Sequence, residues 1–453
     1  MEQDMTRGNP LSVIFMFTLP LAIGNIFQQL YNMADTIIVG RFVGADALAA
    51  VGSTGTIMFL LNGFAQGITA GFSVLTAQRF GAGKKDAVKQ SVTNGILLSI
   101  IGAILLTVLG CAIMDPLLHL MNTPDDIFDM AYTYITLISL GMIANVFYNL
   151  FSSYLRAVGN SKAPLFFLVF SACLNVGLDL FFIVVLKMGV AGAAWATNLS
   201  QAISALLCIV YIYCKVPALV PEKKHWRLTA GDTRYQMQMG IPMALQFAIT
   251  SSGTMIMQSA INLFGSEAVA AYTAACKVHS LLTQGMVAMG QTMAVYSGQN
   301  YGKGDYGRIR AGVKAALIIE FIYSVVSAVA VSLLLGVTLG LFFSGDVDLT
   351  AMMPWARTYI TICTLFYIPL STIFIFRNTM QGCGYGFLPM MRGVVELVAR
   401  MLVAMIAMRV HSYALSCFCD PAAWISAGLF YRCVLSFRDE EDKSYVISER
   451  LII

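Results

Sequence analysis

Two aspartates lie inside segments that are otherwise apolar enough to cross a membrane. Asp35 lies near the end of "LPLAIGNIFQQLYNMADTIIV" (19–39), and Asp179 lies within "FFLVFSACLNVGLDLFFIVVL" (166–186). Neither stretch contains a basic residue that would neutralise its acid. A carboxylate in hydrocarbon costs roughly 2.5–3.5 kcal/mol on insertion scales, so an acid at such a position indicates a function.

Further polar residues share the helical faces of these acids. Tyr31 precedes Asp35 by four residues and Asn175 precedes Asp179 by four, which places each pair on one face of a helix. Thr197, in "GAAWATNLSQ", adds a hydroxyl from the next apolar segment. If the faces converge, the cage can hold Na⁺ through Asp35, Asp179, Asn175 and Thr197, or a proton shared by the two carboxyls. A structural hydrogen-bond network is the alternative.

The second half of the chain has no such pair of acids. There, "RGVVELVARMLVAM" places Glu396 four residues before Arg400. Opposite charges at this spacing meet on one helical face. We therefore predict a secondary polar pair in which Glu396 and Arg400 neutralise each other.

Proline and glycine interrupt several apolar segments. Pro20 lies in the first segment, and Gly63, Gly67 and Gly71 recur every fourth residue in the second. In membrane helices such residues permit close contact between helices or bending. Pro20 is therefore a candidate hinge, with helix packing as the other interpretation.

Composition indicates a polytopic membrane protein. The chain has 453 residues, of which 58% are hydrophobic and 11% charged, and its mean hydropathy is +0.74. Soluble domains carry about 25% charged residues. The sequence has no Gly-rich phosphate loop, HExxH motif or assignable Ser-His-Asp set, and no basic cluster with interleaved aromatic residues. We therefore expect no enzyme, no cofactor and no nucleic-acid partner.

Apolar runs separated by polar breaks predict an all-α protein with twelve transmembrane helices. Each run is long enough to cross a bilayer, which needs about 20 residues. The predicted spans are 12–39, 50–78, 92–114, 130–155, 163–186, 191–214, 237–264, 271–298, 313–343, 355–379, 390–409 and 413–435.

The polar breaks alternate in charge. Basic breaks follow the even-numbered spans, as in "RFGAGKKDAVKQ" (79–90), whereas the breaks "DPLLHLMNTPDDIFD" (115–129) and "SGDVD" (344–348) are acidic. The positive-inside rule then places both termini in the cytoplasm. We expect a multi-pass protein of the inner or plasma membrane of the cell.

An internal repeat divides the chain. "QRFGAGKKD" (78–86) aligns with "QNYGKGDYG" (299–307), and "GADALAAVGS" (44–53) aligns with "GSEAVAAYTA" (265–274). Because six spans return the chain to its starting side, a pseudo-two-fold axis along the membrane normal should relate the two copies. The predicted organisation is an N-terminal six-helix lobe (1–214), a cytoplasmic inter-lobe loop (215–235), a C-terminal six-helix lobe (236–436) and a charged cytoplasmic tail (437–453).

The order of these motifs resembles the multidrug and toxic compound extrusion (MATE) transporters over about residues 10–435. The resemblance rests on "YNMADTIIVGR", "GADALAAVG", "AQRFGAGKKD", "YLRAVGNSKAP", "LNVGLDLFFI", "GAAWATNLSQ", "GVVELVAR" and "DPAAWISAG". Glu396 and Arg400 match a pattern of the bacterial branch that resembles DNA-damage-inducible members.

This resemblance implies two lobes around a cleft that opens alternately, and antiport of small organic, mainly cationic, compounds against H⁺ or Na⁺. In members with an acidic first lobe, the coupling site resembles Asp35, Tyr31, Asn175, Asp179 and Thr197. We expect a monomer in the lipid bilayer. The alternative is a flippase for lipid-linked precursors. Such flippases tend to carry basic residues in the cleft, whereas here the basic residues lie mainly in loops.

Overall fold

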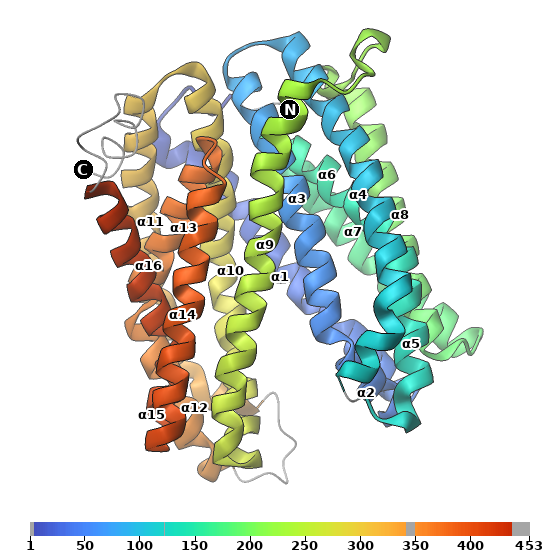
Figure 1. The fold of residues 1–453 in the computed structure, drawn as a ribbon, viewed down its shortest axis with the longest axis vertical. Helices are drawn as coiled ribbons and strands as arrows, with labels where there is room; N and C mark the ends of the chain where they lie inside the picture. Colours follow the sequence, from blue (N-terminus) through green and yellow to red (C-terminus); the bar gives the residue numbers. More distant parts are fainter. Residues whose placement is uncertain (1–3, 122, 341–348, 437–453) are drawn as a thin grey trace. The chain divides into compact units, whose positions relative to one another are not determined.

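The computed structural model describes residues 4–121, 123–340 and 349–436 (Figure 1). Over these residues the chain forms α-helices joined by short turns, and none of the described residues forms a β-strand. This arrangement confirms the all-α class. The predicted tail (437–453) and the acidic break at 344–348 lie outside the described residues.

Contacts group the chain into two compact units. Unit 1 comprises Met1–Met5 and Leu19–Ala248, and unit 2 comprises Thr6–Thr18 and Ile249–Ile453. Two helices belong to both units: α1 (Pro10–Phe42) changes unit after Thr18, and α9 (Ala230–Ile261) changes unit after Ala248. The predicted lobe limits, 1–214 and 236–436, differ from these contact units because the first half of α9 packs with unit 1.

Unit 1 contains most of α1, the first half of α9 and the helices between them. These are α2 (Ala45–Ser53), α3 (Gly55–Gly81), α4 (Lys85–Leu120), α5 (Asp125–Leu140), α6 (Met142–Ala157), α7 (Lys162–Asp179), the π-helix η1 (Leu180–Val185), α8 (Gly189–Lys215), and the short 3₁₀ helices η2 (Pro217–Leu219) and η3 (Lys223–His225).

Unit 2 contains the second half of α9 and the helices that follow it. These are η4 (Asn262–Phe264), α10 (Ser266–Lys303), α11 (Tyr306–Gly340), α12 (Leu349–Leu365), α13 (Tyr367–Gly382), α14 (Phe387–Val410), α15 (Tyr413–Cys417) and α16 (Cys419–Ser436).

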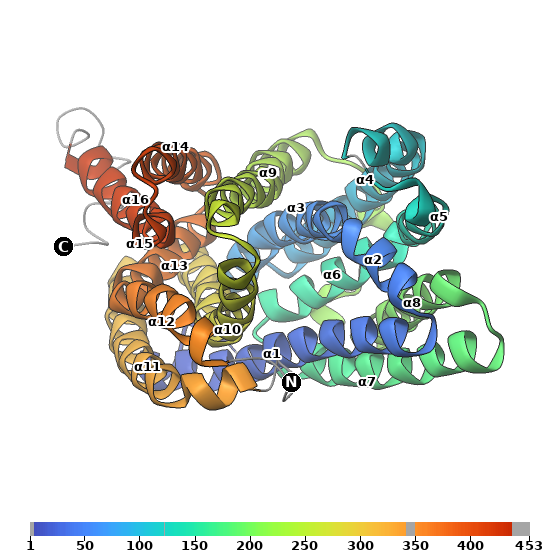
Figure 2. The same ribbon diagram turned by 90° about the horizontal axis from the view of Figure 1, so that it is seen from below.

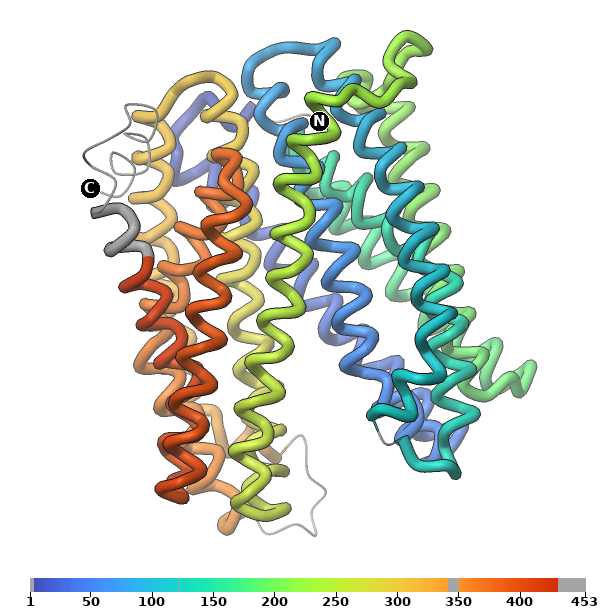
Figure 3. Tube along the Cα trace, in the orientation of Figure 1, coloured from blue at the N-terminus to red at the C-terminus, as the bar shows by residue number. Residues whose placement is uncertain are grey.

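Each of the twelve predicted spans coincides with one helix or with two consecutive helices. Six spans are long and apolar enough to cross a membrane by themselves, namely α1, α3, α4, α7 with η1, α8 and α11. Two more are bent pairs, α5 with α6 at 46° and α12 with α13 at 51°, which Figure 3 traces along the chain. The other four, α9, α10, α14 and α15 with α16, are more polar, and α14 alone carries four charged residues. The fold is that of a multi-pass membrane protein.

The glycines of α3 serve helix packing, as one of the two interpretations predicted. A Cβ atom on Gly67 would lie 2.6 Å from Cα of Ala244, and one on Gly71 would lie 2.5 Å from Cα of Gly240. The backbones of α3 and of the first half of α9 therefore touch. This contact explains why residues up to Ala248 belong to unit 1.

Candidate cation-coupling site

α1 and α7 bring the two acids of unit 1 together. The two helices lie side by side in Figure 2. At their contact, Leu165 and Leu168 of α7 pack over Gly24 of α1. α7 ends at Asp179, and the π-helical turn η1 continues the same span. Such π-turns are frequent at functional sites, because they turn side chains away from regular helical positions.

Asp35 and Asp179 contact each other directly. Their carboxyl groups lie within hydrogen-bonding reach of one another. Asp179 is fully buried and Asp35 is half-buried. Among the described residues, no donor reaches the buried Oδ1 atom of either acid. Since a carboxylate only accepts hydrogen bonds, this contact requires a proton or another cation at the pair.

Asn175 and Thr197 orient Asp179. With its amide nitrogen facing the acid, Asn175 donates to Oδ2 of Asp179 at 3.0 Å, and its oxygen accepts from the backbone N–H of Thr197 at 3.2 Å. This orientation satisfies both polar atoms of an amide that is fully buried. The i, i+4 spacing of Asn175 and Asp179 thus produces the contact that the sequence predicted.

Two tyrosines complete the cluster. The hydroxyl of Tyr31 lies within hydrogen-bonding reach of the Thr197 hydroxyl, and its ring is close to both acids. Tyr134 of α5 is 2% exposed and lies close to Asp35, Asp179 and Tyr31. The sequence did not predict a role for Tyr134. The available signal was the tripeptide "YIT" at 134–136, which recurs at 359–361.

Apolar packing holds these helices in register. On α1, Ile38 and Val39 are buried one turn beyond Asp35, in a cluster that includes Ile138 of α5, Ile183 of η1 and Val190 of α8. The cage is therefore fixed by the elements that supply its polar groups. All five predicted coupling residues converge in unit 1.

The cluster suits a single monovalent cation. It offers two carboxyl groups, an amide and two or three hydroxyls, the hard oxygen ligands that suit H⁺ or Na⁺. Among the described residues, no group of three or more His, Cys, Asp or Glu side chains forms a site for a multivalent metal.

In unit 2 the charges pair differently from the prediction. Arg400 donates from Nε to Oδ1 of Asp420 on α16 at 2.8 Å, and Glu396 pairs with Arg392 at 3.2 Å. All four residues are buried, and none is more than 7% exposed. The carboxylate of Glu396 acts on the Arg400 guanidinium through its negative charge, without a direct ion pair among the described residues. The i, i+4 spacing predicted Glu396 as the partner of Arg400. That prediction was wrong, because Asp420 at the start of α16 forms the ion pair with Arg400 instead.

Pro20 lies inside α1, two residues beyond an anchored position. The hydroxyl of Thr18 donates to Oγ1 of Thr292 on α10 at 2.8 Å, and both threonines are buried. The carbonyl of Ile14, one turn earlier, lies 2.8 Å from the same hydroxyl and is an alternative acceptor for its proton. The start of α1 is thus fixed within unit 2, and Pro20 comes immediately after the point where the helix leaves that unit.

Comparison with known proteins identifies the family. The MatE family model matches residues 20–181 and 242–406, which is most of the chain. The chain belongs to this family of multidrug transporters, as the sequence motifs indicated.

Curated relatives are named for the same class. The probable multidrug resistance protein YpnP of Bacillus subtilis is 31% identical over 311 residues, which cover 68% of each chain. The DNA damage-inducible protein F of Escherichia coli is 25% identical over 336 residues, 70% of each chain.

Solved structures share the fold. A MOP superfamily transporter from Pyrococcus furiosus aligns with a TM-score of 0.87 at 22% identity and covers 95% of this chain and 96% of its own. An outward-facing multidrug resistance MATE family transporter aligns with a TM-score of 0.85 at 22% identity, covering 96% and 98%.

Proposed function

We propose that this chain is a secondary active exporter that moves small organic, mainly cationic and amphipathic, compounds out of the cell in exchange for H⁺. The observation that carries this proposal is the contact between Asp35 and Asp179 inside the membrane-spanning part of unit 1. Two acids in contact bind one positive charge readily and release it when the site opens to a side of low concentration.

The hydrogen bonds around the pair favour H⁺ over Na⁺ as the driving ion. Sodium needs several oxygen ligands, and the amide oxygen of Asn175 already accepts from the Thr197 N–H. The amide nitrogen faces Asp179 and would repel a metal ion placed beside that carboxylate. A shared proton requires no rearrangement of these groups. A sodium ion fits the other amide orientation, in which the Asn175 oxygen faces Asp179 and the nitrogen donates to Oγ1 of Thr197 at 3.4 Å.

Pro20 is our proposed hinge for the conformational change. Thr18 is bonded to Thr292, while Asp35 lies nearly five turns further along the same helix. Protonation of the acid pair removes a negative charge near the far end of α1 and alters its packing on α7. Proline lacks the N–H that would complete the helical ladder, so bending between these two fixed points is least costly at Pro20.

The charge of the site argues for cationic substrates. Between residues 8 and 40, 163 and 186, and 188 and 214, the spans α1, α7 and α8 contain no Lys or Arg. A cavity bordered by two acids and no base attracts organic cations and repels anions. The flippase alternative is less well supported, because the buried Arg392 and Arg400 of α14 already pair with Glu396 and Asp420 and so are not available to a pyrophosphate.

We further propose a monomer in the cell membrane with both termini in the cytoplasm. In unit 1, the basic turn between α3 and α4 lies at the same end as the 215–229 loop, because Lys224 pairs with Asp86. In unit 2, Arg308 donates hydrogen bonds to the carbonyls of Arg7 and Gly8. This contact places the start of the chain beside the turn between α10 and α11. Labelling of Lys223→Cys from outside intact cells, in a background without reactive thiols, would overturn this topology.

Transport in proteoliposomes tests the function. Ethidium efflux should follow an imposed pH gradient, should persist without Na⁺ and should stop when the pH gradient is collapsed. Efflux that follows only a Na⁺ gradient would replace H⁺ by Na⁺. Efflux of anionic dyes with no movement of cations would contradict the charge argument. Flipping of a fluorescent lipid pyrophosphate without ethidium transport would favour the flippase.

A further inference from the structure

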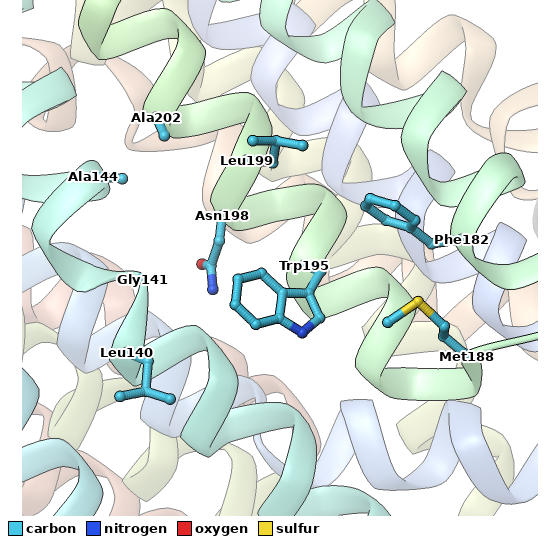
Figure 4. A pocket seen from close by; sticks show the side chains of 9 residues that line it. All are labelled: Leu140, Gly141, Ala144, Phe182, Met188, Trp195, Asn198, Leu199 and Ala202. Carbon is cyan, nitrogen blue, oxygen red and sulfur yellow. The ribbon is translucent and has the colours of Figure 1, made fainter. Parts of the chain in front are cut away.

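A second site lies in unit 1, on the other face of α8 from Thr197. A groove of about 420 Å³ opens where α5 meets α6, and it is bounded by η1 and α8. Figure 4 shows Trp195 and Leu199 of α8 on one wall, Leu140 on the other and Phe182 of η1 at the side. Its volume lies within the range of about 300–1,000 Å³ that is typical of ligand pockets.

The groove exists because the span formed by α5 and α6 is broken. Asn198 donates from Nδ2 to the carbonyl of Leu137 at 2.7 Å, in the last turn of α5. Its amide fills the space where a Cβ atom of Gly141 would stand. This contact joins α8 to the 46° bend, and the groove opens beside the bend, between Leu140 and Ala144 of the broken span and Trp195 of α8. The only polar side chain in the lining is therefore used to hold the break.

The groove continues into an apolar surface. Along α8, Leu206, Val210 and Tyr213 follow the lining residues on the same helical face, and each is at least 50% exposed. A helix face that exposes only apolar and aromatic side chains on a membrane-spanning segment contacts hydrocarbon. The ligand that fits a groove in such a surface is an acyl chain.

A basic residue directly precedes one of the lining residues in the sequence. Lys187 comes immediately before the lining residue Met188, in the turn between η1 and α8, and it is exposed. Its backbone has φ 55°, the left-handed conformation that non-glycine residues rarely adopt, so the turn holds it in a defined place. Within residues 4–121, 123–340 and 349–436 its ammonium group forms no ion pair.

We propose that this groove binds one membrane phospholipid, with an acyl chain between Leu140 and Trp195 and the phosphate beside Lys187. The apolar lining provides burial for the chain, and the ammonium group pairs with the phosphate at the end of the span. The site is separate from the acid pair, since α8 presents Trp195 and Asn198 to the groove and Thr197 to Asn175.

Quenching of Trp195 by a brominated lipid tests the proposal. The full chain in detergent is titrated with phosphatidylglycerol brominated on one acyl chain, and the fluorescence of a Trp195→Phe protein is subtracted. We expect saturable quenching at one lipid per protein. Ala202→Phe fills the groove and should weaken the apparent affinity about tenfold, because each methylene that loses its contact costs about fourfold. Lys187→Gln should weaken it about fivefold.

Leu105→Phe is the matched control, since Leu105 of α4 is also an exposed leucine and lies neither in the groove lining nor on the apolar face of α8. It should leave the titration unchanged. If Ala202→Phe fails to fold, Ala144→Leu narrows the groove from the α6 side. Quenching that rises linearly with lipid, or that is equal in wild type and in the filled variants, would show only general contact with the bilayer and would overturn the proposal.

Discussion

The guanidinium group of Arg400 and the carboxylate of Asp420 form a buried ion pair, with Nε and Oδ1 2.8 Å apart. With the neighbouring pair of Arg392 and Glu396, it balances the charges of α14 inside unit 2. Asp35 and Asp179 of unit 1 have no ion-pair partner among the described residues. The ion pairs of α14 neutralise charges within unit 2, whereas the acid pair of unit 1 needs a cation from outside. In unit 2, Glu320 of α11 is also an acid that is only 2% exposed, and among the described residues no hydrogen-bond partner reaches its Oε2 atom.

Breaking the Arg400 pair should destabilise the protein strongly. Arg400→Gln leaves the carboxylate of Asp420 buried without its partner, which costs about 3–5 kcal/mol in soluble proteins. The double variant Arg400→Gln/Asp420→Asn should recover most of that loss. Thermal unfolding in detergent measures the coupling. Equal losses in the single and double variants would contradict the pairing. Coupling between Arg400 and Glu396 should be smaller, because their side chains are not in contact.

Tyr134→Phe should impair gradient-driven efflux while leaving the protein folded. The hydroxyl of Tyr134 is the additional polar group beside Asp35 and Asp179, and its removal takes one potential donor from the acid pair. Tyr132→Phe on the same helix is the control, because Tyr132 is exposed. Dye efflux at several pH values provides the measurement. A wild-type pH profile for Tyr134→Phe would exclude a role for this residue.

Gly141→Ala should lower the unfolding temperature, because its methyl group would collide with the Asn198 amide. Overpacking of this kind costs about 1–3 kcal/mol. Gly177→Ala is the matched control, since nothing lies within 4 Å of a Cβ atom at that position. It should be neutral or slightly stabilising. Unchanged stability of Gly141→Ala would mean that the bend between α5 and α6 is not held by this contact.

The contact of the 215–229 loop with α4 should weaken in acid. Hydrogen bonds from Lys224 hold the pKa of Asp86 below its ordinary value, and a hydrogen bond from Lys89 does the same for Glu222. A lowered carboxyl pKa stabilises the contact at pH values above the ordinary value of about 4, and the effect is lost as the pH falls through the lowered value.

The fluorescence anisotropy of Trp226, in the same loop, reports this release after subtraction of a Trp226→Phe protein. It should stay constant from neutral pH to about pH 5 and fall below about pH 4. Asp86→Asn should lower the anisotropy already at neutral pH. Release of the wild-type loop near pH 6 would contradict the assignment to these carboxylates.

The sequence alone singles out residues that are costly in their local environment. Asp35 and Asp179 stand out because a carboxylate in an apolar span is expensive, and the i, i+4 spacing adds Tyr31 and Asn175. The twelve spans follow from hydropathy and length in the same way. The repeat predicts two halves of the chain. It did not show that the first half of α9 packs with unit 1 through Gly67 and Gly71.

The remaining features depend on tertiary contacts. Tyr134 reaches the acids from a helix that is distant in sequence, so its spacing carries no local signal. Two acids, Glu396 and Asp420, lie near Arg400. The packing of α14 on α16 brings Asp420 into hydrogen-bond contact with the guanidinium group, and the sequence does not show this packing. The bend at Gly141 depends on the Asn198 side chain of another span.

The most direct test of the account is the proton flux that accompanies substrate transport. Proteoliposomes with an internal pH indicator and an imposed pH gradient are supplied with ethidium on the side from which it is exported. The wild-type protein should consume the pH gradient only when ethidium is present. Asp35→Asn and Asp179→Asn proteins that unfold at wild-type temperatures should move neither ethidium nor protons. Normal coupled transport by Asp35→Asn would show that the acid pair does not carry the driving ion.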